Sequence, residues 1–183
     1  EDAHFSFIVP GGQAAIALVY FAYCTTGSHA LVPYSAYGPN KEMAEGLMKG
    51  LGVEVEPYDP LIGAGISALI RDNTTLIWTE SPGSVTMDVQ DIPAIVEAAH
   101  ARGVAVALDN TYAAGVLFDA FAHKVDVSIQ ALTKYVGGHS DILLGSVSVR
   151  DQAGFEAMGP VYRQLGLAVS PDDCSLALRG VPT

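Results

Sequence analysis

Apolar segments of strand length alternate with helical segments along most of this chain, and this order constrains the fold more than any other feature. Val104–Leu108 is a continuous apolar run that ends at Asp109, while Asp91–Arg102 before it has the pattern of a helix that Gly103 terminates. Strands and helices in turn are typical of a mainly parallel sheet with helices on both faces. The sequence therefore predicts an α/β domain.

Other segments continue the same order. We expect strands at His29–Pro33, Val53–Glu56, Thr75–Thr79, Val125–Ile129 and Ile142–Val149, and helices at Gln13–Tyr23, Pro39–Leu51, Ile66–Ile70 and Gln152–Leu165. No internal repeat or low-complexity linker divides these segments. A chain of 183 residues is long enough for one domain with a full core, so we expect a single domain over residues 1–183.

The composition suits a covered sheet. Hydrophobic residues make up 50% of the chain and charged residues 16%, and the mean hydropathy of +0.31 is high for a self-contained soluble protein. Two interpretations stay open: the core is large, or part of the outer surface is covered by partners or by further chain. The start at Glu1, without a methionine, favours a truncated or processed product.

Charge and hydropathy argue against two classes of partner. The formal net charge of -11 disfavours nucleic acids and anionic membranes, which attract basic surfaces. The longest apolar stretch, Ala14–Tyr23, is about half of the ~20 residues that span a bilayer. Cys24 and Cys174 lie far apart without a metal-binding spacing, which indicates free thiols in a reducing compartment. We therefore expect a cytoplasmic protein.

Lys134 is the most informative single residue. It follows the apolar run Val125–Ile129 and precedes the glycine pair Gly137–Gly138, so it is expected at a strand end beside an open loop. Schiff-base chemistry needs a lysine in such a place, with an amine partly desolvated so that its neutral form is accessible near pH 7. Most lysines at strand ends are exposed and structural, so the Schiff-base interpretation of Lys134 depends on the other residues of the site.

Polar residues gather at the expected strand ends: Tyr37, Glu80, Asp109 and Lys134. Ligands of parallel sheets bind at the carboxyl ends of the strands. Pyridoxal phosphate needs a lysine, an acid beside its pyridine nitrogen, an anion cradle and a cover for its ring. Asp109 closes a buried strand, where a pyridinium proton would satisfy its carboxylate; the alternative is a turn or helix-capping aspartate.

The remaining parts of such a site have candidates too. Gly11 and Gly12 precede a helix and offer backbone N–H groups to a phosphate, and the Thr133 hydroxyl could donate to the same group. Tyr37 could cover the cofactor ring or be an ordinary half-buried tyrosine. His139 has no second metal ligand at a suitable spacing, so we expect a structural histidine and no metal.

Seven segments of the chain resemble, in the same order, the Cys/Met-metabolism family of pyridoxal-phosphate enzymes. They are Pro10–Ile16, Ala36–Pro39, Tyr58–Ala64, Glu80–Ser84, Leu108–Thr111, Ala131–Tyr135 and Gly138–Asp141. The resemblance covers nearly the whole chain. It implies a mostly parallel seven-stranded sheet with helices on both faces, which is the large domain of the aspartate aminotransferase-like fold (fold type I).

The resemblance also implies roles for single residues. Lys134 would hold pyridoxal 5'-phosphate and shuttle protons, Asp109 would pair with the ring nitrogen, and Tyr37 would stack on the ring. The phosphate would be held by the backbone amides of Gly12 and Gln13 together with Thr133. The chain departs from the family pattern at positions that concern phosphate affinity above all: Gly11, Gln13, Tyr112 and Ala131.

Within the family, the segments Asp59–Gly63 and Glu80–Ser84 resemble β-lyases more than γ-lyases or γ-synthases. This implies β-elimination of cystathionine, an amino-acid thioether, to homocysteine, pyruvate and ammonia. A broader cysteine or methionine C–S lyase and a relative of the γ-enzymes are alternatives of similar chemistry. A catalytically silent domain that only binds cofactor or a sister subunit is an alternative of another class.

Members of the family are about twice as long as this chain. They add an N-terminal arm that reaches a neighbour's cofactor phosphate and a C-terminal domain that clamps the substrate carboxylate. The resemblance therefore implies that residues 1–183 are the cofactor-binding large domain alone, and that the intact enzyme is a homodimer or homotetramer.

Overall fold

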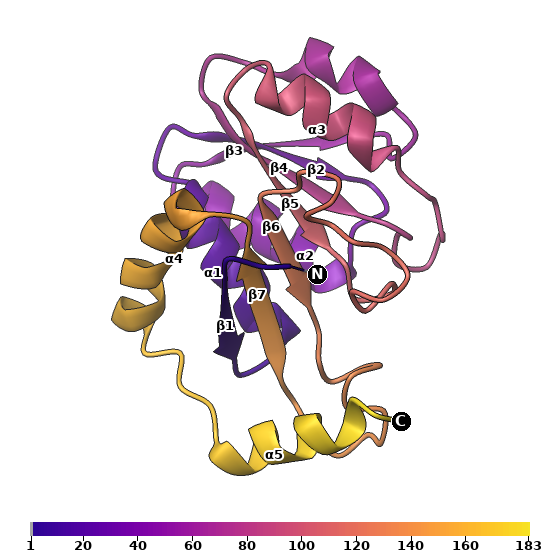
Figure 1. The fold of residues 1–183 in the computed structure, drawn as a ribbon. Coiled ribbons are helices and arrows are strands. Elements are labelled where there is room, and N and C mark those ends of the chain that lie inside the picture. The colour runs from indigo at the N-terminus through magenta and orange to yellow at the C-terminus, as the bar shows by residue number, and fades with distance from the viewer. Residues whose placement is uncertain (1) are drawn as a thin grey trace.

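One seven-stranded sheet forms the centre of the molecule in the computed structural model, which describes residues 2–183 (Figure 1). The strands lie in the order β1-β7-β6-β5-β4-β2-β3. Their bounds are Phe5–Val9 for β1, His29–Pro33 for β2, Glu54–Tyr58 for β3, Thr74–Glu80 for β4, Ala105–Asp109 for β5, Val127–Gln130 for β6 and Gly145–Val149 for β7. The α/β fold expected from the sequence is confirmed.

Helices connect most of these strands. The α-helices are α1 at Gly12–Tyr23, α2 at Gly38–Glu42, α3 at Ile92–His100, α4 at Gln152–Leu165 and α5 at Pro171–Gly180. A π-helix at Met43–Met48 continues α2, and a 3₁₀ helix spans Gly63–Leu69. No helix among residues 2–183 has the length and apolar character needed to cross a membrane.

The sheet has a parallel body and an antiparallel flank. Strands β3, β2, β4, β5 and β6 pair in parallel, whereas β7 runs antiparallel to both of its neighbours, β6 and β1. Ser6 and Ser148 are register partners across the β1–β7 pair, and their hydroxyl oxygens lie 2.8 Å apart. The mainly parallel sheet is thus confirmed. The antiparallel flank was not predicted from the sequence, because hydrophobic periodicity carries no strand direction.

The side chains of each buried strand alternate between two apolar layers. In β4, Leu76 and Trp78 join the layer under α1 and α4, while Ile77 joins the layer under α3. The Trp78 ring stacks on Tyr20 of α1 with a centroid distance of 5.5 Å. Figure 1 shows α3 on one side of the sheet and α1 and α4 on the other. Helices on both faces are therefore confirmed, and the layer under α1 defines the face that carries the candidate site.

Several elements differ from the expected ones. Strand β1 and helix α5 were not predicted, and the strand expected over Ile142–Val149 begins only at Gly145. The preceding residues form a loop instead, in which the backbone of Leu144 bonds to Thr133. Helix α5 is capped by the Ser170 hydroxyl and packs its Ala177 into a small apolar cluster with Leu144. The rest of α5 is mostly exposed and lacks a long apolar stripe, so the sequence pattern did not predict this helix.

Candidate functional site

Three parallel strands end side by side in the middle of the sheet. Glu80, the last residue of β4, is the register partner of Asp109, the last residue of β5, and Asp109 is paired in turn with Ile129 of β6. Because side chains alternate along a strand, Glu80 lies on the same face as Trp78, under helix α1. Two carboxyl groups therefore lie next to each other on that face, at the edge where a parallel sheet binds its ligands.

Asp109 is a half-buried acid without a cationic partner within residues 2–183. Burial raises the pKa of its carboxyl group, and hydrogen bonds from the hydroxyl and backbone N–H of Thr111 oppose that rise. The Thr111 N–H donates to Asp109 Oδ1 at 3.1 Å, which is the geometry of an Asx turn. No lysine, arginine or histidine among residues 2–183 forms an ion pair with Asp109. The turn role considered from the sequence is thus present, and the carboxylate still needs a counter-charge.

Glu80 is buried more completely, with 3% of its surface exposed. Its Oε2 accepts the backbone N–H of Tyr37 at 2.7 Å, and its Oε1 accepts that of Ser84 at 2.9 Å. Burial, and after it the charge of Asp109, raises the pKa of Glu80 to about 7. Glu80 thus joins the end of β4 to the loop that carries Tyr37.

The start of α1 approaches the segment that follows β6. A Cβ on Gly12 would lie 3.0 Å from the Ala131 Cβ, so only a glycine fits there without a shift. The Ala131 N–H donates to the Thr111 hydroxyl oxygen at 2.9 Å, which connects this segment to the turn after Asp109. The first-turn amides of a helix have no partner within it, and α1 has neither a side-chain cap nor an acidic residue in its first turn. These N–H groups can receive an anion.

Gln13 and Tyr37 lie on neighbouring segments. The Gln13 Nε2 donates to the Pro39 carbonyl oxygen at 3.2 Å, which joins α1 to the start of α2. Tyr37 is the N-cap residue of α2, and its side chain is 43% exposed. An exposed ring held at this edge of the sheet is available to stack on a planar ligand.

Lys134 and Thr133 differ from expectation in detail. The Lys134 side chain is exposed, so the partial desolvation expected from the sequence is wrong for this structure. The reason is that Lys134 lies four residues beyond the end of β6, in a turn where its N–H donates to the Ala131 carbonyl oxygen at 3.0 Å. The Thr133 hydroxyl donates to the Leu144 carbonyl oxygen at 3.1 Å and accepts the Leu144 N–H at 3.0 Å. That hydroxyl fixes the loop before β7.

Contacts link the predicted residues at this edge: Asp109 to Ala131 through Thr111, Ala131 to Gly12, and Gln13 to Pro39 beside the loop of Tyr37. Lys134 follows Thr133 directly and is tied by its backbone to Ala131, the residue that Gly12 approaches. His139 uses its Nδ1 to donate to the Gly137 carbonyl oxygen at 2.8 Å. Across residues 2–183, no three His, Cys, Asp or Glu side chains are grouped so that they could hold a metal ion.

Two contributors to this edge, Thr111 and Ser84, were missed as functional candidates in the sequence. Thr111 stands two residues after an aspartate that ends a strand, a spacing typical of an Asx turn, so it could have been found. The backbone N–H of Ser84 donates to Glu80, and no side-chain pattern in the sequence reveals such a bond. The rings of Tyr112 and Tyr135 lie 6.4 Å apart, although 23 residues separate them in the chain.

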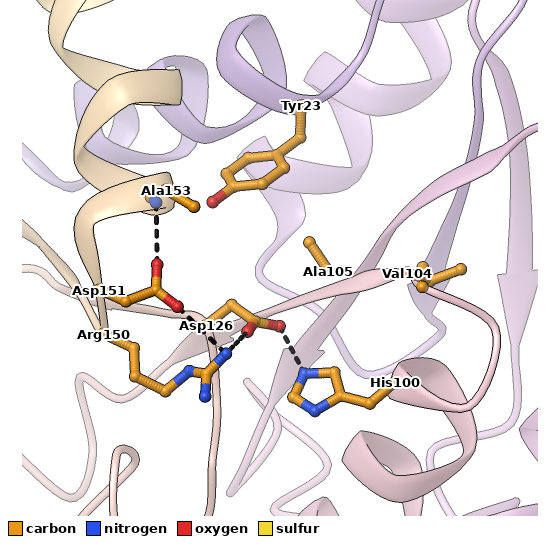
Figure 2. Close-up of a pocket in the computed structure, with 10 residues that line it drawn as sticks. Tyr23, His100, Val104, Ala105, Asp126, Arg150, Asp151 and Ala153 are labelled. Atoms are coloured by element: carbon orange, nitrogen blue, oxygen red, sulfur yellow. Dashed lines mark hydrogen bonds and ion pairs between the residues drawn. The ribbon is translucent and has the colours of Figure 1, made fainter.

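A hollow lies at the opposite ends of the strands (Figure 2). It has a volume of about 310 Å³ and is lined by residues that include Tyr23, His100, Asp126, Arg150 and Asp151. Asp126 accepts hydrogen bonds from Arg150 Nη2 at 2.8 Å and from the Val106 N–H at 2.8 Å, and it lies 2.9 Å from His100 Nε2. Arg150 Nη2 also lies 3.4 Å from Asp151 Oδ2, so the arginine pairs with both aspartates. None of the predicted site residues lies in it.

Comparison with known proteins gives matches over the whole chain. The family model described as Cys/Met metabolism PLP-dependent enzyme matches residues 1–183. A protein of Rhizobium johnstonii assigned as a cystathionine beta-lyase is 47% identical over 100% of this chain and 46% of its own length. The cystathionine beta-lyase of Escherichia coli is 39% identical over 96% of this chain and 45% of its own length.

A solved structure agrees with these sequence matches. Cystathionine gamma-lyase from Lactobacillus plantarum, complexed with L-serine, superposes with a TM-score of 0.92 at 28% identity, over 96% of this chain and 46% of that one. The chain therefore spans about half the length of the proteins it matches.

Proposed function

Since the chain belongs to the Cys/Met-metabolism family of pyridoxal-phosphate-dependent enzymes, we propose that residues 1–183 form the cofactor-binding domain of a carbon–sulfur lyase that acts on cystathionine by β-elimination. The products are homocysteine, pyruvate and ammonia. The observation that carries this proposal is the juxtaposition of Asp109, an acid without a cation, with the uncapped first turn of α1 and the segment of Lys134.

The residues of this edge fit a phosphorylated pyridine ring. Helix α1 has no side-chain cap, so its first amides can bind a phosphate. Asp109 lacks a counter-charge, as a residue that faces a pyridinium nitrogen requires. Tyr37 presents an exposed ring on the neighbouring loop. Bound pyridoxal phosphate supplies an electron sink for the negative charge that forms on the substrate's α-carbon.

Each residue has a distinct task in this proposal. Lys134 holds the cofactor at its Nζ atom and moves the proton of the substrate's α-carbon. The Asp109 carboxylate stabilises the positive charge at the ring nitrogen, and the Tyr37 ring covers the cofactor. The backbone N–H groups of Gly12 and Gln13 bind the phosphate, and Thr133 holds the loop before β7 beside it.

Reduction with borohydride followed by peptide mapping tests the attachment. The full-length protein is incubated with pyridoxal phosphate, reduced and digested, and the expected label lies on the peptide that contains Lys134. The Lys134→Ala variant is the matched control and is expected to carry no label. A label on another lysine of the wild type would contradict the assignment.

Gamma-elimination is the second candidate, because the chain is similar to a cystathionine gamma-lyase of known structure. Product analysis separates the two reactions: β-elimination of cystathionine releases pyruvate, and γ-elimination releases 2-oxobutyrate. The sequence of Glu80–Ser84 supports β-elimination. Cofactor binding without either product would instead support a domain that only binds cofactor.

We also propose that the intact enzyme is a homo-oligomer. Large apolar side chains on the loops after β4 and β5 are exposed, with Val85 at 95% and Val116 and Leu117 at 84% each. Exposed apolar patches mark interaction surfaces. Light scattering on the full-length protein tests this proposal, with a dimer or tetramer as the expected result and a monomer as the contrary one.

A further inference from the structure

The proposed function assigns no task to Glu80, although Glu80 is the more deeply buried of the two acids at this edge. Its charge has no cationic partner, because no lysine, arginine or histidine within residues 2–183 forms an ion pair with it. A buried carboxylate without a counter-charge is costly, and proteins keep such groups mainly at functional sites. Glu80 therefore needs an explanation beyond packing.

The two oxygen atoms of Glu80 bind two different loops. Oε2 accepts the Tyr37 N–H at 2.7 Å, and Oε1 accepts the Ser84 N–H at 2.9 Å. Tyr37 belongs to the connection between β2 and α2, whereas Ser84 belongs to the loop after β4. A single side chain thus fixes both loops to the end of β4.

The two loops also touch each other next to these bonds. A Cβ on Gly83 would lie 2.5 Å from the Ser35 Cβ, so the loop after β4 lies directly against the segment that leads to Tyr37. The Ser35 side chain is buried. Any loosening at Glu80 would therefore be transmitted to both loops together.

We propose that Glu80 is a positioning residue of the cofactor site: its carboxylate holds the backbones of Tyr37 and Ser84 against the strand end beside Asp109. This inference rests on the proposed function, since Tyr37 and Asp109 are the residues that would contact the cofactor ring. Asp109 is the ionisable neighbour of Glu80 across the β4–β5 pair. The charge of Glu80 therefore also acts on the acid that faces the ring nitrogen.

Two substitutions separate the hydrogen bonds from the charge. Glu80→Gln keeps one acceptor oxygen and removes the charge, and Glu80→Ala removes both acceptors. Glu45→Gln is the matched control, because Glu45 is exposed on the π-helix. Should Glu80→Ala fail to fold, Glu80→Gln still tests the inference, since its amide places an oxygen toward one N–H group and an NH2 group, which cannot accept, toward the other.

The first measurement is hydrogen exchange on the full-length protein without cofactor. Exchange at the amides of Tyr37 and Ser84 is expected to rise about tenfold in Glu80→Ala, the factor that corresponds to one hydrogen bond to a charged group. Exchange in α3 is expected to stay unchanged. In Glu80→Gln, at least one of the two amides is expected to exchange faster. Unchanged exchange at both amides in both variants would overturn the inference.

The second measurement is cofactor binding, followed through the absorbance of bound pyridoxal phosphate as a function of pH. Glu80→Gln is expected to bind the cofactor about tenfold more weakly and to shift the pH at which the absorbance changes, while Glu45→Gln does neither. Faster exchange with an unchanged affinity and an unchanged pH profile would show a merely structural role and also overturn the inference. A wild type that binds no cofactor would overturn the proposed function itself. The two failures are distinguishable, because the exchange experiment is carried out without cofactor.

Discussion

Gly12, the first residue of α1, approaches Ala131 so closely that a Cβ on it would lie 3.0 Å from the Ala131 Cβ. This approach brings the amino end of a helix against the segment that follows β6. The proposed phosphate cradle is thus made of backbone from two parts of the chain that lie more than 100 residues apart.

A methyl group at Gly12 tests this cradle directly. Gly12→Ala is expected to weaken pyridoxal phosphate binding about tenfold, or ~1.4 kcal/mol, because Ala131 must move to make room. Gly50→Ala is the control, since a Cβ at Gly50 meets no atom within 4 Å. Fluorescence titration of both variants provides the measurement. Equal affinities would mean that this contact does not shape the phosphate site.

A second glycine is predicted to control stability. Gly83→Ala would place its Cβ 2.5 Å from the Ser35 Cβ, so the two loops must separate. We expect a loss of ~1–3 kcal/mol in the free energy of unfolding, as for other overpacked sites. Gly46→Ala lies in open space within a helical segment and is expected to be neutral or stabilising. Urea unfolding measures both effects, provided that the slope of the free energy of unfolding against urea concentration is the same in all variants.

The hollow at the amino ends of the strands has a structural role in our interpretation. Asp126→Ala removes the acceptor for Arg150 and for the Val106 N–H, and is expected to destabilise the fold by ~1–3 kcal/mol. Asp72→Ala breaks only the exposed pair with Arg102, and a change within about 0.5 kcal/mol is expected. Thermal unfolding of the two variants would reveal the contrast. Similar losses in both would contradict the role of Asp126.

Glu80 predicts a particular dependence of stability on pH. The carboxyl group has a pKa of about 7 in the folded protein, raised from its ordinary 4.5 mainly by burial. Between these two values the unfolded chain has lost the proton while the folded chain keeps it, so stability falls as the pH rises. Relative to Glu80→Gln, the wild type is expected to lose on the order of 3 kcal/mol over this window, since one pKa unit corresponds to ~1.4 kcal/mol.

The free energy of unfolding of both proteins is measured at several pH values from about 4 to about 8, a range that encloses both pKa values of Glu80. The hydrogen bond lost in Glu80→Gln adds a constant term and does not change the trend with pH. A difference that stays constant across the window would show that Glu80 titrates as in an unfolded chain.

The two cysteines are expected to react at different rates. Burial raises the pKa of the Cys24 thiol to about 11, and its side chain is 5% exposed, so little thiolate is available to a reagent. Cys174 lies on α5 and is partly exposed. Mass spectrometry of the peptides from residues 1–183 after brief alkylation is expected to find a label on Cys174 alone in the native protein, and on both cysteines after denaturation. Early labelling of Cys24 would contradict its burial.

Local pattern was sufficient to predict most of the fold. Strand β2 and helix α4 have the predicted bounds, because His29–Pro33 is a short run between turn residues and Gln152–Leu165 has clear ends. Strand direction was not predictable, because β7 is antiparallel only through its pairing with distant residues. The bounds of β7 were also missed, since Ile142 looks like strand but packs against α5 instead.

The site was predictable to the extent that its residues follow strand ends. Asp109 and Tyr37 lie where the sequence placed them, at one edge of the sheet. The accessibility of Lys134 was not predictable, since it depends on the course of the turn after β6. Glu80 was noted only as a polar strand end, because the two backbone N–H groups that it accepts have no signature in the sequence.

The antiparallel flank has a consequence for how the protein is made. Strand β1 bonds to no strand but β7, and Phe5 pairs with Val149, which the ribosome adds only after the whole parallel body. During synthesis, the apolar β1 therefore has no strand to pair with until β7 has been added. Closure of this edge is a late event in biogenesis, and a chaperone that shields nascent chains would find its target there.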